Sequence, residues 1–227
     1  MSRIVIIGGH GKVALLLAPI LRDAGHTVVS LIRDADQAPD VAAAGAEPLV
    51  VSVEDATQQD VTAALSGADA AVWAAGAGGK GGPERTDAVD RQAAIRSMAA
   101  AADADVKRYV MVSWAGSHGD KPVPEDNGLY NYAMAKLDAD KHLVSTDLDW
   151  TIVGPGTLTL DEPSGEIEVT REVGTTGAPT SRANVARVIA AVLADDATIH
   201  RVIPFKDGST PIAEAVHDVP EEYADLD

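Results

Sequence analysis

A tyrosine and a lysine four residues apart are the first residues with clear chemical potential. Tyr132 and Lys136 would share one face of a helix, so their side chains could converge. A phenol with a pKa of about 10 exchanges protons poorly at neutral pH, but a nearby ammonium stabilises the phenolate. The pair could therefore exchange a proton with a carbonyl or an alcohol. The alternative interpretation is an ordinary buried tyrosine beside an exposed lysine.

A glycine-rich segment near the N-terminus is the second candidate. The chain reads GGHGKVA over residues 8–14, directly after the apolar run IVII. Gly8 lets the chain turn off a strand, Gly11 leaves room for a pyrophosphate, and Ala14 lets helix and strand pack closely. The N-terminus of the following helix offers free N–H groups and a positive dipole end. A strand-to-helix turn uses glycine anyway, but this context favours dinucleotide binding.

Alternating segments supply the elements that must position these residues. Short β-branched runs predict strands at residues 3–8, 27–32, 48–53, 68–74, 106–113 and 150–153. Ala-rich stretches between them predict helices at residues 12–24, 35–44, 55–65, 84–102 and 128–145. This order predicts a doubly wound parallel sheet, the Rossmann fold, with helices on both faces. Pro19 should bend the first helix.

The regular alternation of predicted strands and helices ends after residue 153. A half-exposed strand is expected at residues 166–173, a helix at 181–195, a strand at 201–205 and a short helix at 210–216. This segment is too short for a core of its own. We therefore expect one domain over residues 1–227, with a dinucleotide-binding core (1–153) and a small C-terminal cap of substrate-side elements (154–227).

Composition excludes several classes of function. The chain has 227 residues and a formal net charge of −17, which disfavours nucleic acids and anionic membrane surfaces as partners. It contains no cysteine, so disulfides and thiolate chemistry are excluded. The six histidines lack paired ligand spacing, which predicts no metal site. Without a signal-like or membrane-spanning run, we expect a cytoplasmic protein, whether monomer or homodimer.

Five motifs together resemble the short-chain dehydrogenase/reductase superfamily, in the extended and atypical branch that holds NmrA-like and NAD-dependent epimerase/dehydratase-like proteins. They are the G-x-x-G-x-x-A loop, AVWAAGAG, Tyr-x3-Lys, LDWTIVGPGTLT and DGSTPIAEAV. The resemblance implies that Tyr132 is the acid/base and that Lys136 also holds the nicotinamide ribose. It also implies that Ser113 orients the substrate oxygen. Relatives often have a second serine at Trp114 and an arginine at Gly154, which implies either a relocated substrate contact or an active site that has lost its competence.

A nicotinamide cofactor follows from this resemblance. By analogy, NAD-preferring relatives carry an acid at Ile32, whereas NADP-preferring ones carry a basic residue at Arg33. Lys12 could add a second positive charge, whereas Asp34 would oppose a phosphate. We therefore expect NADP, with NAD as the alternative. The expected cofactor-binding residues are Gly8, His10, Gly11, Lys12, Val13, Arg33, Ser52, Val53, Ala75, Gly76, Lys136 and Pro155.

The sequence thus predicts an NADP-dependent oxidoreductase that transfers hydride to or from a small carbonyl or alcohol. Two alternatives remain open. The chain could be a non-catalytic NmrA-like redox sensor, or it could perform epimerase or dehydratase chemistry with a retained nicotinamide.

Overall fold

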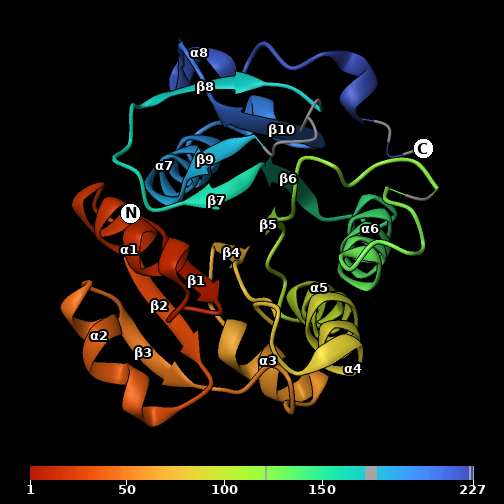
Figure 1. Cartoon of the computed structure of the whole chain (residues 1–227). Coiled ribbons are helices and arrows are strands. Elements are labelled where there is room, and N and C mark those ends of the chain that lie inside the picture. The colour runs from red at the N-terminus through yellow and green to blue at the C-terminus, as the bar shows by residue number, and fades with distance from the viewer. Residues whose placement is uncertain (121, 172–177, 225, 227) are drawn as a thin grey trace.

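A mostly parallel sheet organises the chain in the computed structural model (Figure 1), which describes residues 1–120, 122–171, 178–224 and 226. Within these residues the main sheet has nine strands in the order β11-β8-β10-β6-β5-β4-β1-β2-β3. Strands β3, β2, β1, β4, β5, β6 and β10 run parallel, and β8 pairs antiparallel with β10 and β11. The bounds are β1 Arg3–Ile7, β2 Thr27–Ile32, β3 Glu47–Val50, β4 Ala70–Trp73, β5 Arg108–Val112, β6 Asp149–Pro155, β8 Glu166–Val169, β10 Arg201–Asp207 and β11 Thr210–Pro211.

Helices cover both faces of this sheet, which confirms the doubly wound Rossmann-like fold. The helices are α1 Lys12–Asp23, α2 Ala38–Ala43, α3 Gln58–Leu65, α4 Gly82–Thr86, α5 Ala94–Asp103, α6 Tyr130–Val144, α7 Arg182–Leu193 and α8 Ile212–Ala215. Figure 1 shows α1 and α7 on one side of the sheet and α5 and α6 on the other.

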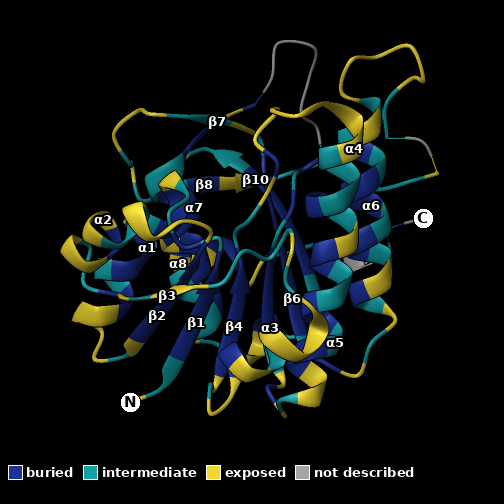
Figure 2. Ribbon diagram, turned by 90° about the horizontal axis from the view of Figure 1, so that it is seen from below, coloured by how far each residue is buried: buried dark blue, intermediate teal, exposed yellow. Residues whose placement is uncertain are grey.

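Two apolar cores result, one on each face of the sheet. Successive residues of β1 point to opposite faces, so Ile4 and Ile6 join the core under α1 and α7, whereas Val5 and Ile7 join the core under α3, α5 and α6. Figure 2 shows the central strands buried along most of their length. Burial on both faces explains why these strands read as continuous apolar runs.

Three predicted helices differ in detail. Helix α1 contains Pro19 and ends at Asp23, one residue before the predicted end, and the bend expected at Pro19 stays a prediction. The segment expected as a helix at residues 35–44 begins with a 3₁₀ turn, Ala35–Gln37, that leads into α2. The long helix expected at residues 84–102 is three elements, because the π-helix Asp87–Ala93 lies between α4 and α5. A π-helical turn carries one extra residue, and such turns often mark functional positions.

The segment after residue 153 is more than a cap. It adds β10 to the sheet beside β6 and then β8 and β11 at the edge. A separate pair of short strands, β7 Thr157–Thr159 and β9 Pro179–Ser181, leads into α7, whose N-terminus is capped by the Ser181 hydroxyl. Residues 172–173 of the strand expected at 166–173 lie outside the described residues, and short 3₁₀ turns occur at Asp196–Thr198 and Glu221–Ala224.

Among the described residues, no helix combines the length and apolar character that a membrane span requires.

Candidate active site

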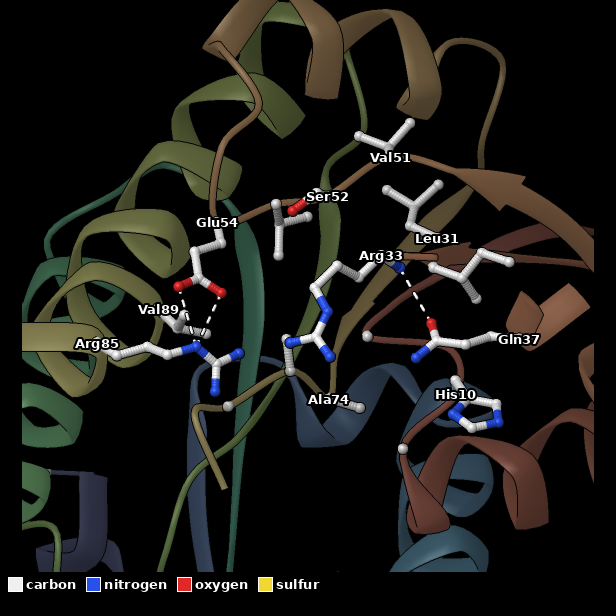
Figure 3. Close-up of a pocket in the computed structure, with 16 residues that line it drawn as sticks. His10, Leu31, Arg33, Gln37, Val51, Ser52, Glu54, Ala74, Arg85 and Val89 are labelled. Carbon is white, nitrogen blue, oxygen red and sulfur yellow. Dashed lines mark hydrogen bonds and ion pairs between the residues drawn. The ribbon is translucent and has the colours of Figure 1, made fainter. Parts of the chain in front are cut away.

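A cavity of about 210 Å³ opens where strands β1, β2 and β4 end (Figure 3). Strand β1 lies between β2 and β4, so the chain order reverses at this point, which is where open α/β sheets bind ligands. Eight of the predicted cofactor residues line the cavity: Gly8, His10, Gly11, Arg33, Ser52, Val53, Ala75 and Gly76. It is also lined by Leu31, Ile32, Gln37, Val51, Glu54, Ala74, Arg85 and Val89.

The glycine turn is packed too tightly for side chains. Gly8 has a φ of +88°, and a Cβ there would lie 2.6 Å from the backbone N and Cα of Ala75. A Cβ on Gly9 would lie 2.3 Å from the Cβ of Ser30, a contact that the sequence did not predict. The Gly11 N–H closes the turn by donating to the Gly8 carbonyl at 2.9 Å. The chain can therefore leave β1 only with glycines at positions 8 and 9.

The N-terminus of α1 is open toward an anion. Gly11 is its N-cap residue and supplies no side-chain hydrogen bond to the first turn. The backbone N–H groups and the positive end of the helix dipole therefore fit a pyrophosphate. Lys12 and Val13 form this first turn without lining the cavity itself.

Arg33 extends into the same cavity from the end of β2, and Figure 3 shows its guanidinium in the middle of the space. Its exposed side chain suits a ribose phosphate, because a guanidinium binds phosphate through paired hydrogen bonds. Asp34 next to it accepts the Asp36 N–H at 3.0 Å and begins the 3₁₀ turn. Its carboxylate therefore serves the backbone, in line with the helix-capping role that its position suggested.

His10 is the other titratable side chain at this end of the cavity. Its Nε2 lies 2.8 Å from an Asp40 carboxylate oxygen. Asp40 thereby holds the imidazole at the rim of the cavity, next to the glycine turn.

The opposite wall contains an ion pair that the sequence did not reveal. The Arg85 Nε lies 3.0 Å from both carboxylate oxygens of Glu54, and its Nη1 donates to the Ala77 carbonyl at 3.1 Å. On the same wall, the hydroxyl of Ser52, one of the expected cofactor-binding residues, donates to an Asp55 carboxylate oxygen at 2.7 Å. The partners Arg85 and Glu54 are 31 residues apart, and no short-range pattern connects them.

Tyr132 and Lys136 lie on α6, beside the end of β5. Lys136 is only 2% exposed, and its Nζ donates to the Val112 carbonyl at 2.7 Å. This burial contradicts the alternative of an exposed lysine. The Tyr132 ring lies 6.3 Å from the Trp114 ring, centroid to centroid. The arrangement places a phenol and an ammonium at the carboxyl edge of the sheet.

Ser113 is bound to a buried carboxylate. Its hydroxyl donates to Asp140 Oδ2, and the Ser117 hydroxyl donates to the same oxygen at 2.5 Å. A serine hydroxyl has one proton, so a Ser113 that gives it to Asp140 can only accept a hydrogen bond from a substrate. The role expected for Ser113 remains a prediction, and this geometry restricts it to an acceptor.

The two departures from the superfamily pattern touch each other. A Cβ on Gly154 would lie 3.0 Å from the Trp114 carbonyl oxygen, so a longer side chain there would need the backbone to move. The Trp114 ring in turn covers Gly116, where a Cβ would lie 2.4 Å from the indole. Pro155, after Gly154, accepts the Ala115 N–H at 3.0 Å through its carbonyl. The end of β6 is therefore closed by Trp114 rather than by an arginine.

The electrostatics around Tyr132 differ from the expectation. Burial raises the pKa of Tyr132, and the carboxylates of Asp90 and Asp140 raise it further. The sequence predicted a lowered pKa from Lys136, but the charge of Lys136 acts on the two acids instead. Burial likewise raises the pKa of Asp90 and Asp140, and Lys136 opposes the shift in both. The lowering of the Tyr132 pKa that the sequence predicted is therefore not found.

Asp90 connects this cluster with the cavity. It lies in the π-helix, is 2% exposed, and accepts the Ala77 N–H at 3.0 Å. A Cβ on Gly76 would lie 3.0 Å from its other carboxylate oxygen. Asp90 therefore fixes the segment after β4 that lines the cavity, while its charge acts on Lys136 and Tyr132.

Asp90→Asn should remove one contribution to the pH dependence of stability. A raised pKa means that the folded protein binds the proton more tightly than the unfolded chain, so this residue's contribution to stability falls as pH rises above 3.8. Asparagine keeps an acceptor for the Ala77 N–H and cannot ionise. The variant should therefore gain stability relative to the wild type between acid and neutral pH, measured by urea unfolding.

Asp60→Asn is the matched control with the opposite sign. Hydrogen bonds from Thr57 lower the pKa of Asp60. Its contribution is therefore lost as pH falls, and the asparagine variant should lose stability relative to the wild type as pH rises. Parallel pH curves for the wild type and Asp90→Asn would refute the assignment of a destabilising buried charge to Asp90.

Comparisons with known proteins agree with this geometry. A sequence profile described as NAD(P)H-binding matches residues 8–196. A protein named as an uncharacterized sugar epimerase, YhfK of Bacillus subtilis, is 32% identical over 94% of this chain and 98% of its own length.

Two solved structures are also similar over nearly the whole chain. A putative NAD-dependent epimerase/dehydratase from Bacillus halodurans has a TM-score of 0.86 and 32% identity, covering 96% of this chain and 100% of that one. The oxidoreductase ylbE from Lactococcus lactis has a TM-score of 0.85 and 30% identity, covering 97% and 98%. With its glycine turn and buried Lys136, the chain therefore belongs to the NAD(P)H-binding family, in the NmrA-like and epimerase-like branch of the short-chain dehydrogenase/reductase superfamily.

Proposed function

We propose that the chain is an NADP-dependent oxidoreductase that acts on a small carbonyl or alcohol. The observation that carries the proposal is the buried Lys136, four residues after Tyr132 on α6, at the same edge of the sheet as the cavity. A lysine removed from solvent beside a phenol is costly unless it serves a purpose, and such groups mark functional sites. Asp90 links the two places, because it binds Ala77 beside the cavity and acts on Tyr132.

The residues of the cavity and of the elements beside it fit the parts of a nicotinamide dinucleotide. Gly8, Gly11 and the first turn of α1 with Lys12 and Val13 would hold the pyrophosphate, with His10 at the rim. Arg33 would bind the 2′-phosphate, and Ser52 and Val53 would lie near the adenine. Ala75, Gly76, Lys136 and Pro155 would complete the nicotinamide end. When bound, the cofactor supplies or accepts a hydride.

The chain's own contribution is the proton. Tyr132 donates its hydroxyl proton to the substrate oxygen, and the nearby Lys136 ammonium stabilises the phenolate that this leaves. Trp114 lies against the Tyr132 ring and provides an apolar wall that excludes water from one side. Substrate oxygen, phenol and ammonium then form one path for the proton.

Arg33→Ala should lower NADPH affinity by about tenfold or more, because a charge-assisted phosphate contact contributes about 1.5–3 kcal/mol. NADH affinity should stay nearly constant, since NADH has no 2′-phosphate. Fluorescence titration with both dinucleotides measures the two effects. Arg3→Ala is the charge-matched control, because Arg3 begins β1 at the opposite edge of the sheet. Equal losses for NADPH and NADH would contradict the assignment of Arg33 to the phosphate.

An epimerase or dehydratase is the second candidate, favoured by the similarity to the structure from Bacillus halodurans. Tyr132 and Lys136 could serve such an enzyme equally, but its cofactor would stay bound and would not be consumed. A panel of carbonyl substrates with NADPH decides between the candidates, because only the oxidoreductase consumes NADPH stoichiometrically. A sensor without catalysis would bind NADPH and turn over none of them.

A further inference from the structure

An ion pair forms one wall of the dinucleotide cavity. Arg85 lies in α4 and Glu54 in the segment after β3, and the Arg85 Nε lies 3.0 Å from both carboxylate oxygens of Glu54. Their side chains are only 23% and 27% exposed, and both residues line the cavity. A partly buried pair of this kind is screened by dissolved salt much less than a pair on the open surface. The charges of this wall can therefore act on an anionic ligand in the cavity.

The segment after β3 has a second attachment beside this pair. The Arg96 Nη2 donates to the Val53 carbonyl at 2.6 Å. Arg85 also donates through its Nη1 to the Ala77 carbonyl at 3.1 Å, in the segment after β4. Because Arg96 holds Val53 independently of Glu54, the wall keeps an anchor when the ion pair is broken. Substitutions in the pair should therefore change the charge of the wall more than its position.

Arg33 lies in the same cavity as this pair. Figure 3 shows its guanidinium between the ion pair on one side and His10 on the other. The backbone N–H of Arg33 donates to the Gln37 side chain, but among the described residues no group pairs with its guanidinium. Arg85, in contrast, neutralises the Glu54 carboxylate. The positive charge of Arg33 therefore stays available for an anion, although a carboxylate lines the same cavity.

We propose that Arg85 determines cofactor specificity: by pairing with Glu54, it leaves Arg33 free to bind the 2′-phosphate of NADP. Without Arg85, the Glu54 carboxylate would compete with that phosphate for Arg33 and would also repel it. NAD carries a hydroxyl at this position of the ribose, so its binding would change little. The inference rests on the proposed NADP dependence, because it extends the role given there to Arg33.

The test is a fluorescence titration of the full-length protein with NADPH and with NADH at low ionic strength. Arg85→Gln should lower NADPH affinity about fivefold, the effect of an ion pair at a partly exposed site, and should change NADH affinity little. Adding Glu54→Gln to this variant removes the unpaired carboxylate and should restore the ratio of NADPH to NADH affinity. The proposal is overturned if Arg85→Gln keeps the wild-type ratio, or if the double variant restores nothing.

Glu54→Gln alone should move the same ratio in the opposite direction. The amide oxygen of glutamine can still accept a hydrogen bond from the Arg85 Nε, whereas the wall loses its negative charge. NADPH affinity should therefore rise relative to NADH affinity. This variant also covers the case in which Arg85→Gln does not fold. An unchanged or lowered ratio in Glu54→Gln would mean that the pair only holds two segments together, and it would overturn the proposal.

Arg91→Gln is the matched control. Arg91 lies in the π-helix that follows α4 and pairs with Asp87 and Asp138, but it does not line the cavity. Its substitution removes the same charge from a neighbouring ion pair and should leave the ratio of affinities unchanged. A shift as large as that of Arg85→Gln would refute a specific role of the Glu54–Arg85 pair.

Arg33→Ala separates this inference from the proposed function. If the wild type shows no NADPH preference that depends on Arg33, the proposed NADP dependence fails, and the inference fails with it. If Arg33→Ala loses the preference but Arg85→Gln retains it, the proposed function stands and only the role of Arg85 is refuted.

Discussion

The Tyr132→Phe variant should reduce kcat for carbonyl reduction by about 10²–10⁴-fold, the range that a positioned proton donor contributes. Only one hydroxyl is removed, so the fold and the contact of the ring with Trp114 should persist. Since Tyr132 is not among the residues that line the dinucleotide cavity, NADPH affinity should change little. Steady-state kinetics and fluorescence titration with NADPH measure these two effects separately.

Tyr130→Phe is the matched control for that experiment. Tyr130 begins α6 two residues earlier, and residues two apart do not share a helix face. It also lacks a lysine four residues on, where Met134 stands. Loss of the Tyr130 hydroxyl should leave kcat nearly unchanged. Equal kcat in the wild type and Tyr132→Phe would remove the proposed acid, and a change in KM alone would reduce Tyr132 to a packing partner of Trp114.

The parallel strands were predictable because burial on both faces leaves a strong pattern. Strand β2 agrees with the sequence-based range at both ends, but β3 ends at Val50 rather than at residue 53. The residues that follow Val50 are apolar or small, so they look like strand. In the structure they leave the sheet and line the cavity. The errors at the carboxyl ends of strands therefore fall where the site is built.

The sequence predicted only those parts of the candidate site that are formed by residues close together along the chain. The glycine turn, Arg33 and the Tyr132–Lys136 spacing are short-range features, and the structure puts the first two in the cavity. The ion pair of Arg85 with Glu54 depends on tertiary contacts, as does the burial of Asp140 under Ser113. No repeating pattern of residue types in the sequence indicates such contacts.

The π-helix was equally hidden from the sequence. The stretch from Asp87 to Ala93 has ordinary helical composition, and nothing in its sequence marks the π-helical turn. It is this turn that contains Asp90, which binds Ala77 and acts on Lys136. The strand β10 was expected, but not its pairing with β6, because parallel pairing depends on partners far apart in sequence.

Gly8→Ala should both destabilise the protein and abolish dinucleotide binding. The left-handed φ of +88° alone costs about 1–2 kcal/mol for alanine. The added Cβ would also lie 2.6 Å from backbone atoms of Ala75, which cannot rotate away as a side chain can. We expect a total loss of about 3 kcal/mol or more, since strain and overpacking add. Urea unfolding measures this loss, and NADPH fluorescence measures binding.

Gly25→Ala separates the two causes. Gly25 follows α1 with nearly the same φ, +87°, but an added Cβ there would meet nothing within 4 Å. The free energy of unfolding of this variant should fall only by the cost of the left-handed backbone, about 1–2 kcal/mol, and its NADPH affinity should be kept. If both variants lose the same stability and both still bind NADPH, the close approach of Gly8 to Ala75 has no role in forming the cavity. A larger loss in Gly8→Ala, together with lost binding, would show that the same tight turn shapes the fold and the dinucleotide site.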